Sequence, residues 1–164
     1  ENDEVTKHRA GITFAQLRDI PREDIQAHMS DPRVSKHMPL STFEWNSEAV
    51  ASFLAMKGAY WRRDGLGHWA FLSDGVYVGW GGFQKEGDEW DFGLVLRPEC
   101  FGLGMRITQT ALIFARADAR IPFVTFLLPP SRKKLGALVR LGAKLIGDVE
   151  HANTRFLKFR LETQ

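Results

Sequence analysis

The stretch Leu94-Val95-Leu96-Arg97-Pro98-Glu99-Cys100-Phe101-Gly102-Leu103-Gly104-Met105-Arg106 decides the fold of this chain. An apolar strand ends at Leu96, a glycine-containing loop follows, and helical periodicity begins near Leu103. The first N–H groups of a helix lack intrahelical partners and carry partial positive charge, so this loop is a candidate anion site. Glycine lets a backbone approach a phosphate without an intervening Cβ. A plain, tight strand-to-helix connection would show the same pattern.

Two common phosphate-binding motifs do not fit the loop. A dinucleotide-binding fingerprint needs a third glycine and a unit of parallel strands, but here the third glycine is missing and the preceding strands read as a meander. A Walker loop needs Lys-Ser or Lys-Thr, and neither follows Gly104.

Outward from the loop, the patterns predict an α+β domain around one mixed sheet. The expected strands are 12–17, 69–72, 76–83, 90–96, 121–128, 143–149 and 154–161. The expected helices are 21–28, 31–37, one capped by Asn46, one after Leu103, and 132–141 with Ser131 as its cap. The turn sequences Ser73-Asp74-Gly75 and Gly87-Asp88 join three strands into a meander. Glycines around Trp80 indicate a bulge or a close approach by another group.

Composition narrows the function classes. The 164 residues, 44% hydrophobic and 26% charged, predict one folded domain over 1–164. A net charge of +2 argues against nucleic-acid and membrane partners. The single Cys100 excludes an internal disulfide framework and fits a reducing, cytoplasmic setting. The five histidines lack ligand spacing, so no metal is expected. The basic run 132–134 is either a solvated helical turn or a phosphate contact.

Two blocks of sequence resemble the GNAT acyltransferases, particularly their ribosomal-protein acetyltransferase-like (RimJ/RimL-like) branch. That family has E-I-G-Y-x-(I/L/V)-x-P-E followed by Q/R-x-x-G-x-G/A, where this chain has D-F-G-L-V-L-R-P-E at 91–99 and F-G-L-G-M-R at 101–106. Its Asn-led helix ending in L-G-F is matched by Ser131 and by Leu-Gly-Ala at 141–143. Segment 31–38 is similar to the branch's substrate-side helix.

The resemblance spans nearly the whole chain in element order. It implies an α/β/α sandwich-like GNAT fold, with a mixed, mostly antiparallel sheet of six to seven strands flanked by about four helices. It also implies an acetyl-CoA-dependent N-acetyltransferase acting on a primary amine, of a small molecule or a peptide N-terminus, by direct base-assisted attack on the thioester. GNAT-like domains often dimerise, which leaves a homodimer open.

The resemblance also assigns the cofactor contacts. The backbone of 94–96 would pair with the pantetheine arm and the thioester carbonyl, and the N–H groups of 102–106 would hold the pyrophosphate. The expected cofactor-binding residues are Leu94, Val95, Leu96, Phe101, Gly102, Leu103, Gly104, Met105, Arg106 and Ser131.

Five positions depart from the family pattern. Phe101 replaces Gln or Arg, Arg106 replaces the final Gly or Ala, and Ser131 replaces Asn. Leu138 stands where many members keep a Tyr that protonates the leaving thiolate, and Phe126 where some keep a Glu. The alternative is therefore a catalytically weak or inactive acyl-CoA-binding module of the same fold. A third reading is an interaction protein whose aromatic groove binds a partner.

Asp91 is the first candidate for the general base, because it matches the Glu of the family strand and lies among apolar residues that would raise its pKa. An exposed acid, or one paired with Arg, is the other reading. His68 is the second candidate, since histidine titrates in the useful range; a structural role is its alternative. Ser131 is a candidate polar contact to the thiol or the cofactor.

The resemblance implies that the acceptor lies between the N-terminal helices and the meander. The candidate wall residues are Trp45, Trp61, Trp69, Trp80 and, as a polar contact, Gln84. Each tryptophan could instead fill the core. The sequence has no acidic cluster that would mark a polycationic acceptor, which favours a peptide N-terminus or a small hydrophobic amine.

Overall fold

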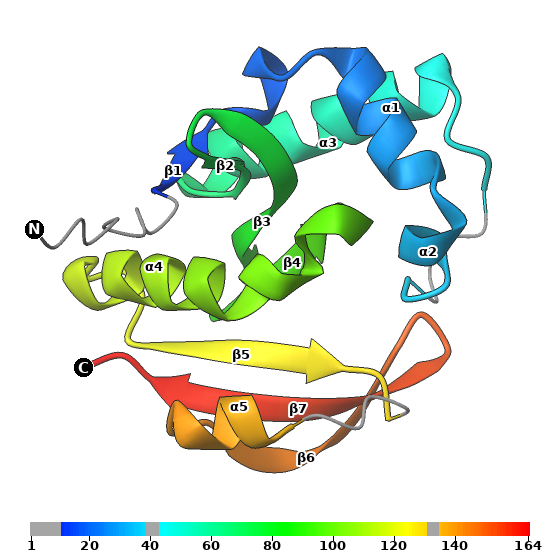
Figure 1. The fold of residues 1–164 in the computed structure, drawn as a ribbon. Coiled ribbons are helices and arrows are strands. Elements are labelled where there is room, and N and C mark those ends of the chain that lie inside the picture. The colour runs from blue at the N-terminus through cyan, green and yellow to red at the C-terminus, as the bar shows by residue number, and fades with distance from the viewer. Residues whose placement is uncertain (1–10, 39–42, 131–134) are drawn as a thin grey trace, which may run out of the picture.

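The computed structural model describes residues 11–38, 43–130 and 135–164, which form one seven-stranded mixed sheet with helices on both faces (Figure 1). The strands are β1 (Ile12–Ala15), β2 (His68–Ser73), β3 (Val76–Glu86), β4 (Glu89–Leu96), β5 (Phe123–Leu128), β6 (Lys144–His151) and β7 (Thr154–Glu162). The α-helices are α1 (Arg22–Ser30), α2 (Pro32–Ser35), α3 (Ser47–Asp64), α4 (Gly104–Ala117) and α5 (Gly136–Arg140), and the 3₁₀ helices are η1 (Leu17–Asp19) and η2 (Pro98–Leu103).

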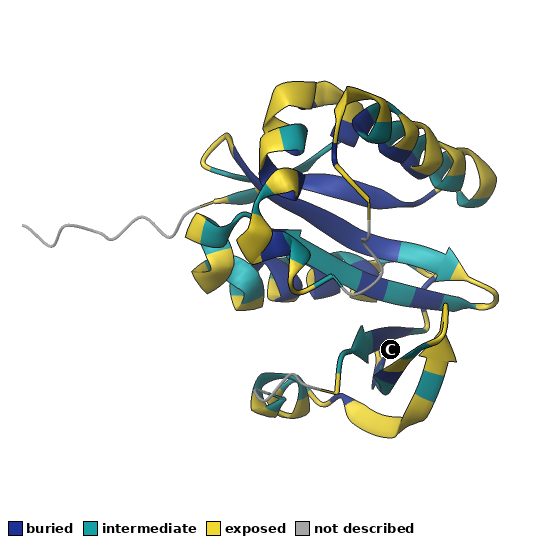
Figure 2. Ribbon diagram, turned by 90° about the vertical axis from the view of Figure 1, so that its right-hand side faces the viewer, coloured by how far each residue is buried: buried dark blue, intermediate teal, exposed yellow. Residues whose placement is uncertain are grey.

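The sheet order is β1-β2-β3-β4-β5-β7-β6, and every neighbouring pair is antiparallel except β4–β5. The predicted meander of β2, β3 and β4 and the mixed, mostly antiparallel sheet are confirmed. Strand β6 forms an edge and is exposed along nearly its whole length (Figure 2).

Residues that the sequence pattern assigned to helix ends are found at those ends. The Asn46 side chain accepts a hydrogen bond from the Ala49 N–H at 2.8 Å, which caps α3. Gly65 ends α3 with a left-handed φ of 70°, and Gly142 follows α5 with φ 98°. The Asp31 side chain caps α2.

Several predicted bounds were wrong by a few residues. The strand expected over 121–128 begins only at Phe123, after Pro122, which has no N–H to donate. The strand expected over 12–17 ends at Ala15, because the chain turns into η1. The strand expected over 76–83 continues to Glu86. Ser131 and the basic run 132–134 lie outside the described residues.

Two hydrophobic clusters hold the sheet between its helices. The cluster on the α4 face includes Trp69, Phe83 and Ile107, and the cluster on the face of α1 and α3 includes Ile25 and Trp80. Because side chains alternate along β4, Trp90 and Phe92 point into the α4-face cluster and Asp91 points toward the other face.

The β4–β5 junction is the feature that positions the site. The two parallel strands pair only at Trp90–Val124 and Asp91–Thr125, although β4 continues to Leu96. Beyond Asp91 the strands separate, so in the described sheet β4 is paired from Phe92 onward on its β3 side alone. The last part of β4 thus presents backbone hydrogen-bonding groups toward the space between the two strands.

Candidate active site

Asp91 lies at the point where β4 and β5 part. The Thr125 hydroxyl donates a hydrogen bond to Asp91 Oδ1 at 3.0 Å. Burial raises the pKa of Asp91 to about 7, although the Thr125 hydrogen bond acts in the opposite direction. Glu86 and Glu89 raise the pKa further, because their negative charges disfavour a second one nearby. A carboxyl group with this pKa can exchange a proton near neutral pH, as a general base must.

Four further polar side chains gather on the same face of the sheet, and we call them with Asp91 the polar cluster: Lys57, His68, Gln84, Glu86 and Asp91. Gln84 stands opposite Asp91 in the β3–β4 register. Gln84 Oε1 accepts from Lys57 Nζ at 3.0 Å, and Gln84 Nε2 donates to Glu86 at 2.8 Å. Lys57 Nζ also lies 2.9 Å from His68 Nδ1. Three residues expected in the site, Asp91, His68 and Gln84, are therefore brought together.

Sequence reasoning missed Lys57, which is only 6% exposed. Its ammonium lies 4.9 Å from the centre of the Trp80 ring and 5.6 Å from that of Phe53. Burial lowers its pKa to about 8, and the negative charge of Glu86 opposes that shift. The available signal was helical spacing, because Val50, Phe53, Lys57 and Trp61 follow one another on the buried face of α3.

His68 begins β2 and is 7% exposed. Burial, reinforced by the charge of Lys57, holds the pKa of His68 well below its usual range, so the ring is neutral at neutral pH. The ring lies beside the middle of β4, because a Cβ built on Gly93 would be 3.5 Å from it. The absence of a side chain at Gly93 thus leaves room for the imidazole next to the separating strand.

The predicted anion loop is folded as η2 followed directly by α4. The Cys100 N–H donates to the Arg97 carbonyl at 2.8 Å, and the Gly104 N–H donates to the Phe101 carbonyl. A side chain on Gly102 would meet no atom within 4 Å, so the backbone there borders open space. Gly104 instead packs against the side chains of Leu94 and Leu96 at the end of β4.

The structure thus brings the described candidates for cofactor contact to one end of β4. Leu94 and Val95 are partly exposed and Leu96 is buried, whereas Phe101 and Met105 are largely exposed at 48% and 38%. The remaining members of the set, Gly102, Leu103, Gly104 and Arg106, continue into α4.

The tryptophans divide between the two faces of the sheet. Trp45 and Trp80 belong to the cluster under α3, and both contact the Phe53 ring. Trp69 is 6% exposed and stacks on Phe14 in the α4-face cluster, on the other side of the sheet from Asp91. The partly buried Trp61 donates from Nε1 to the His68 carbonyl at 2.8 Å.

Phe126 and Leu138, which replace the Glu and the Tyr of the family pattern, both lie among apolar side chains. Phe126 is 3% exposed and packs edge-on against the Phe92 ring, so it is part of the core. Leu138 packs against the α4-face cluster. Neither residue brings an acid or a phenol to the polar cluster.

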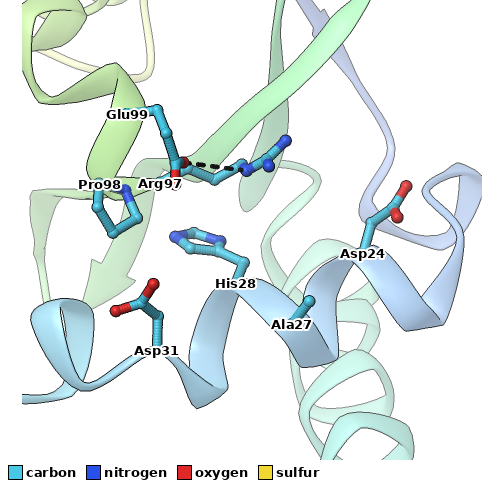
Figure 3. A pocket seen from close by; sticks show the side chains of 7 residues that line it. All are labelled: Asp24, Ala27, His28, Asp31, Arg97, Pro98 and Glu99. Atoms are coloured by element: carbon cyan, nitrogen blue, oxygen red, sulfur yellow. Dashed lines mark ion pairs between the residues drawn. The ribbon is translucent and has the colours of Figure 1, made fainter.

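A separate cavity of about 210 Å³ lies between α1 and the segment after β4 (Figure 3). Its lining residues are Asp24, Ala27, His28, Asp31, Arg97, Pro98 and Glu99. His28 Nδ1 is hydrogen-bonded to the Tyr77 hydroxyl at 2.7 Å, and Arg97 pairs with Glu99 at 3.8 Å. Of the expected site residues that the structure describes, none lines this cavity.

Over the described ranges, no three His, Cys, Asp or Glu side chains gather as a metal ion would require, and the expectation of no metal stays a prediction. None of the helices in these ranges combines the length and apolarity needed to span a bilayer.

Sequence comparison places this geometry in a known family. The family model described as an acetyltransferase (GNAT) domain matches residues 12–153. The chain belongs to the GNAT acetyltransferase family. The predicted GNAT fold is confirmed, because solved GNAT structures superpose on nearly the whole chain.

The GNAT acetyltransferase from Bacillus anthracis has 16% identity and a TM-score of 0.72, covering 94% of this chain and 97% of the other. The acetyltransferase from Agrobacterium tumefaciens has 18% identity and a TM-score of 0.71, covering 94% and 92%. The spermidine N-acetyltransferase from Vibrio cholerae, solved with CoA and spermine, has 8% identity and a TM-score of 0.73, covering 93% and 95%. At these identities, the similarity shows a shared fold.

Proposed function

We propose that this protein is an acetyl-CoA-dependent N-acetyltransferase that acts on a primary amine, with Asp91 as the general base. The observation that carries the proposal is the position of Asp91, a carboxyl group with a pKa of about 7 at the point where β4 and β5 separate. Family membership supports acetyl transfer in general. The Vibrio cholerae relative crystallised with CoA and spermine supports a CoA thioester and an amine as substrates.

The end of β4 and the loop that follows it have groups that can bind a CoA thioester. Among the residues that the structure describes, no strand pairs with one edge of β4 from Phe92 to Leu96, and the backbone groups there match the amides of a pantetheine arm. The open space at Gly102 lies at the start of the following helix, where partial positive charge favours a pyrophosphate. When bound, acetyl-CoA would supply an activated acyl group with a thiolate as leaving group.

Asp91 would remove a proton from the incoming ammonium, so that the amine lone pair can form the new C–N bond as the C–S bond breaks. The second proton lost by the nitrogen would pass to the departing thiolate, which leaves the neutral amide and the CoA thiol. Its pKa near neutrality allows it to be ionised when the amine arrives and to hold the proton afterwards. Thr125, which donates to Oδ1, keeps the carboxyl group oriented while leaving the other oxygen available.

The acceptor would approach from the face of α1 and α3, where Asp91 points. Trp45, Trp80 and Gln84 lie on that face, so we retain them as candidate acceptor contacts. Trp61 packs against the α4-face cluster and contacts the Trp69 ring, so it is not retained as an acceptor contact. Trp69 packs on the other face, so it has no place in this proposal.

We further propose membership of the RimJ/RimL-like branch, on the strength of segment 31–38, and a cytoplasmic location, on the strength of the single Cys100.

The test is a thiol-release assay with acetyl-CoA against a panel of small amines, polyamines and peptides. We expect release with at least one amine and a loss of about 10²-fold or more in kcat for Asp91→Asn. The matched control is Asp88→Asn, which changes an exposed acid in the β3–β4 turn and should leave the rate unchanged. Equal rates for Asp91→Asn and wild type would reject Asp91 as the base.

The second candidate function is an acyl-CoA-binding module without turnover. The observation that favours it is the apolar packing of Leu138 and Phe126, which stand where the resemblance places a Tyr in many members and a Glu in some. Calorimetry separates the two functions, because this module would bind acetyl-CoA and CoA yet release no thiol with any acceptor.

A further inference from the structure

The contact between Lys57 and His68 is not needed to hold α3 against the sheet, since apolar side chains already fill that interface. Lys57 Nζ is 2.9 Å from His68 Nδ1, and both residues are more than nine-tenths buried. The hydrogen bond to Lys57 uses Nδ1 of the His68 ring. The other ring nitrogen, Nε2, lies toward β4, because a Cβ built on Gly93 would be 3.7 Å from it.

The chemistry of the contact fixes where the imidazole proton lies. An ammonium group can only donate hydrogen bonds, so Nδ1 must accept through its lone pair. A neutral imidazole carries one proton, which must then be on Nε2. His68 therefore has a donor, not an acceptor, at Nε2, and a ring in that state cannot remove a proton there.

We propose that Lys57 is a positioning residue that holds His68 in the Nε2-protonated tautomer, so that His68 donates a hydrogen bond to the acyl oxygen of the bound thioester. This inference rests on the proposed function and assigns His68 the role of an oxyanion donor instead of a base. The placement follows from Gly93, because the ring lies beside this residue, at the start of the β4 stretch proposed to hold the thioester. Such donors stabilise charge that develops in the transition state.

Lys57 remains charged at neutral pH, although burial lowers its pKa to about 8. The Trp80 and Phe53 rings face the ammonium, and Gln84 Oε1 accepts from it. The charged and titratable groups around the pair are Lys57 itself on α3, His68 on β2, Glu86 on β3 and Asp91 on β4. Glu86 favours the ammonium, whereas burial disfavours it.

Above a pH of about 8, Lys57 loses its proton, and the neutral amine can either donate to Nδ1 or accept from Nδ1–H, so the Nε2-protonated tautomer is no longer enforced. Asp91 must be ionised, which requires a pH above about 7. The rate should therefore rise through pH 7 and fall again above pH 8. The falling limb belongs to Lys57 and His68, whereas the rising limb belongs to Asp91.

The first test is ¹⁵N NMR of the histidine ring in the protein without any ligand, at pH 6.5 and pH 9.5. We expect His68 in the Nε2–H tautomer at pH 6.5 and an increased population of the Nδ1–H tautomer at pH 9.5. A ring protonated on Nδ1 at pH 6.5 overturns the proposal. This readout needs no activity, so it separates failure of the inference from failure of the proposed function.

The second test is kinetic and uses Lys57→Met and Lys57→Arg, with Arg62→Met on the exposed face of α3 as control. Lys57→Met should lower kcat by about 10²-fold while KM for acetyl-CoA changes by less than about twofold. Lys57→Arg, which keeps a donor toward Nδ1, should restore much of the rate and remove the fall above pH 8. An unchanged falling limb in Lys57→Arg overturns the proposal. If Lys57→Met does not fold, the Arg variant and the NMR measurement still decide.

Discussion

Replacing Asp91 with Asn should make the protein more stable and less active at the same time. The amide keeps the shape of the carboxyl group and can still accept the hydrogen bond from Thr125. The amide cannot ionise, so the folded protein no longer has a negative charge at this partly buried position at the β4–β5 junction. The same change removes the proposed base.

The magnitude follows from the pKa of Asp91, which burial raises from its ordinary 3.8 to about 7. Each pKa unit is worth about 1.4 kcal/mol, so a fully buried group would give about 4 kcal/mol. Solvent reaches part of the side chain, and we expect about 2 kcal/mol after screening. Between pH 4 and pH 7, Asp91 keeps its proton in the folded state but loses it in the unfolded state. The contribution of Asp91 therefore lowers the free energy of unfolding of the wild type as the pH rises through this range, and it is constant above pH 7.

The assay is urea denaturation of wild type and Asp91→Asn at several values between pH 4.5 and pH 8.5, with Asp88→Asn as control. The stability advantage of the Asn variant should grow through pH 7 and then stay constant. A difference that does not depend on pH would refute the reasoning, since it would mean that Asp91 ionises as freely in the folded as in the unfolded chain.

Four further variants test the rest of the site. Gly82→Ala should destabilise the fold by about 2 kcal/mol or more in urea denaturation, because φ is +118° and the new Cβ would lie 2.6 Å from the Trp69 ring. Gly102→Val should leave stability within about 0.5 kcal/mol and raise KM for acetyl-CoA about tenfold, since it fills only the open space of the proposed pyrophosphate seat. Trp69→Ala should cost about 4 kcal/mol by the same denaturation measurement, as expected of a core residue. Cys100→Ser should keep thiol-release activity, and the wild-type thiol should alkylate slowly at pH 7.5, because partial burial raises its pKa.

Most of the fold could be predicted because the deciding signals are local. Turn sequences such as Ser73-Asp74-Gly75 define the meander, and the Asn46 cap and Gly65 define the ends of α3. The bulge suspected near Trp80 proved to be two separate features. The β2–β3 register shifts near Val78, while Gly81 marks the close approach, since its Cβ would meet the Gly93 carbonyl.

The polar cluster could be predicted only in part. Asp91 and His68 belong to residue types that suggest chemistry, and both were expected in the site. Lys57 was missed because a lysine between Phe53 and Trp61 on a helix is usually solvated, and its contact with His68 depends on how α3 packs across the sheet. That packing is a tertiary property, which periodicity along one helix does not contain.

The two-residue contact between β4 and β5 divides the sheet into a four-strand half and a three-strand half. Few backbone hydrogen bonds join the halves, so their relative orientation depends on the side chains of the α4-face cluster. A pantetheine arm bound along the free edge of β4 would form hydrogen bonds where β5 does not pair with β4, and it would thereby hold the two halves of the sheet in a fixed orientation. Amide hydrogen exchange in β5 should then slow when that arm binds, even at residues that never touch it.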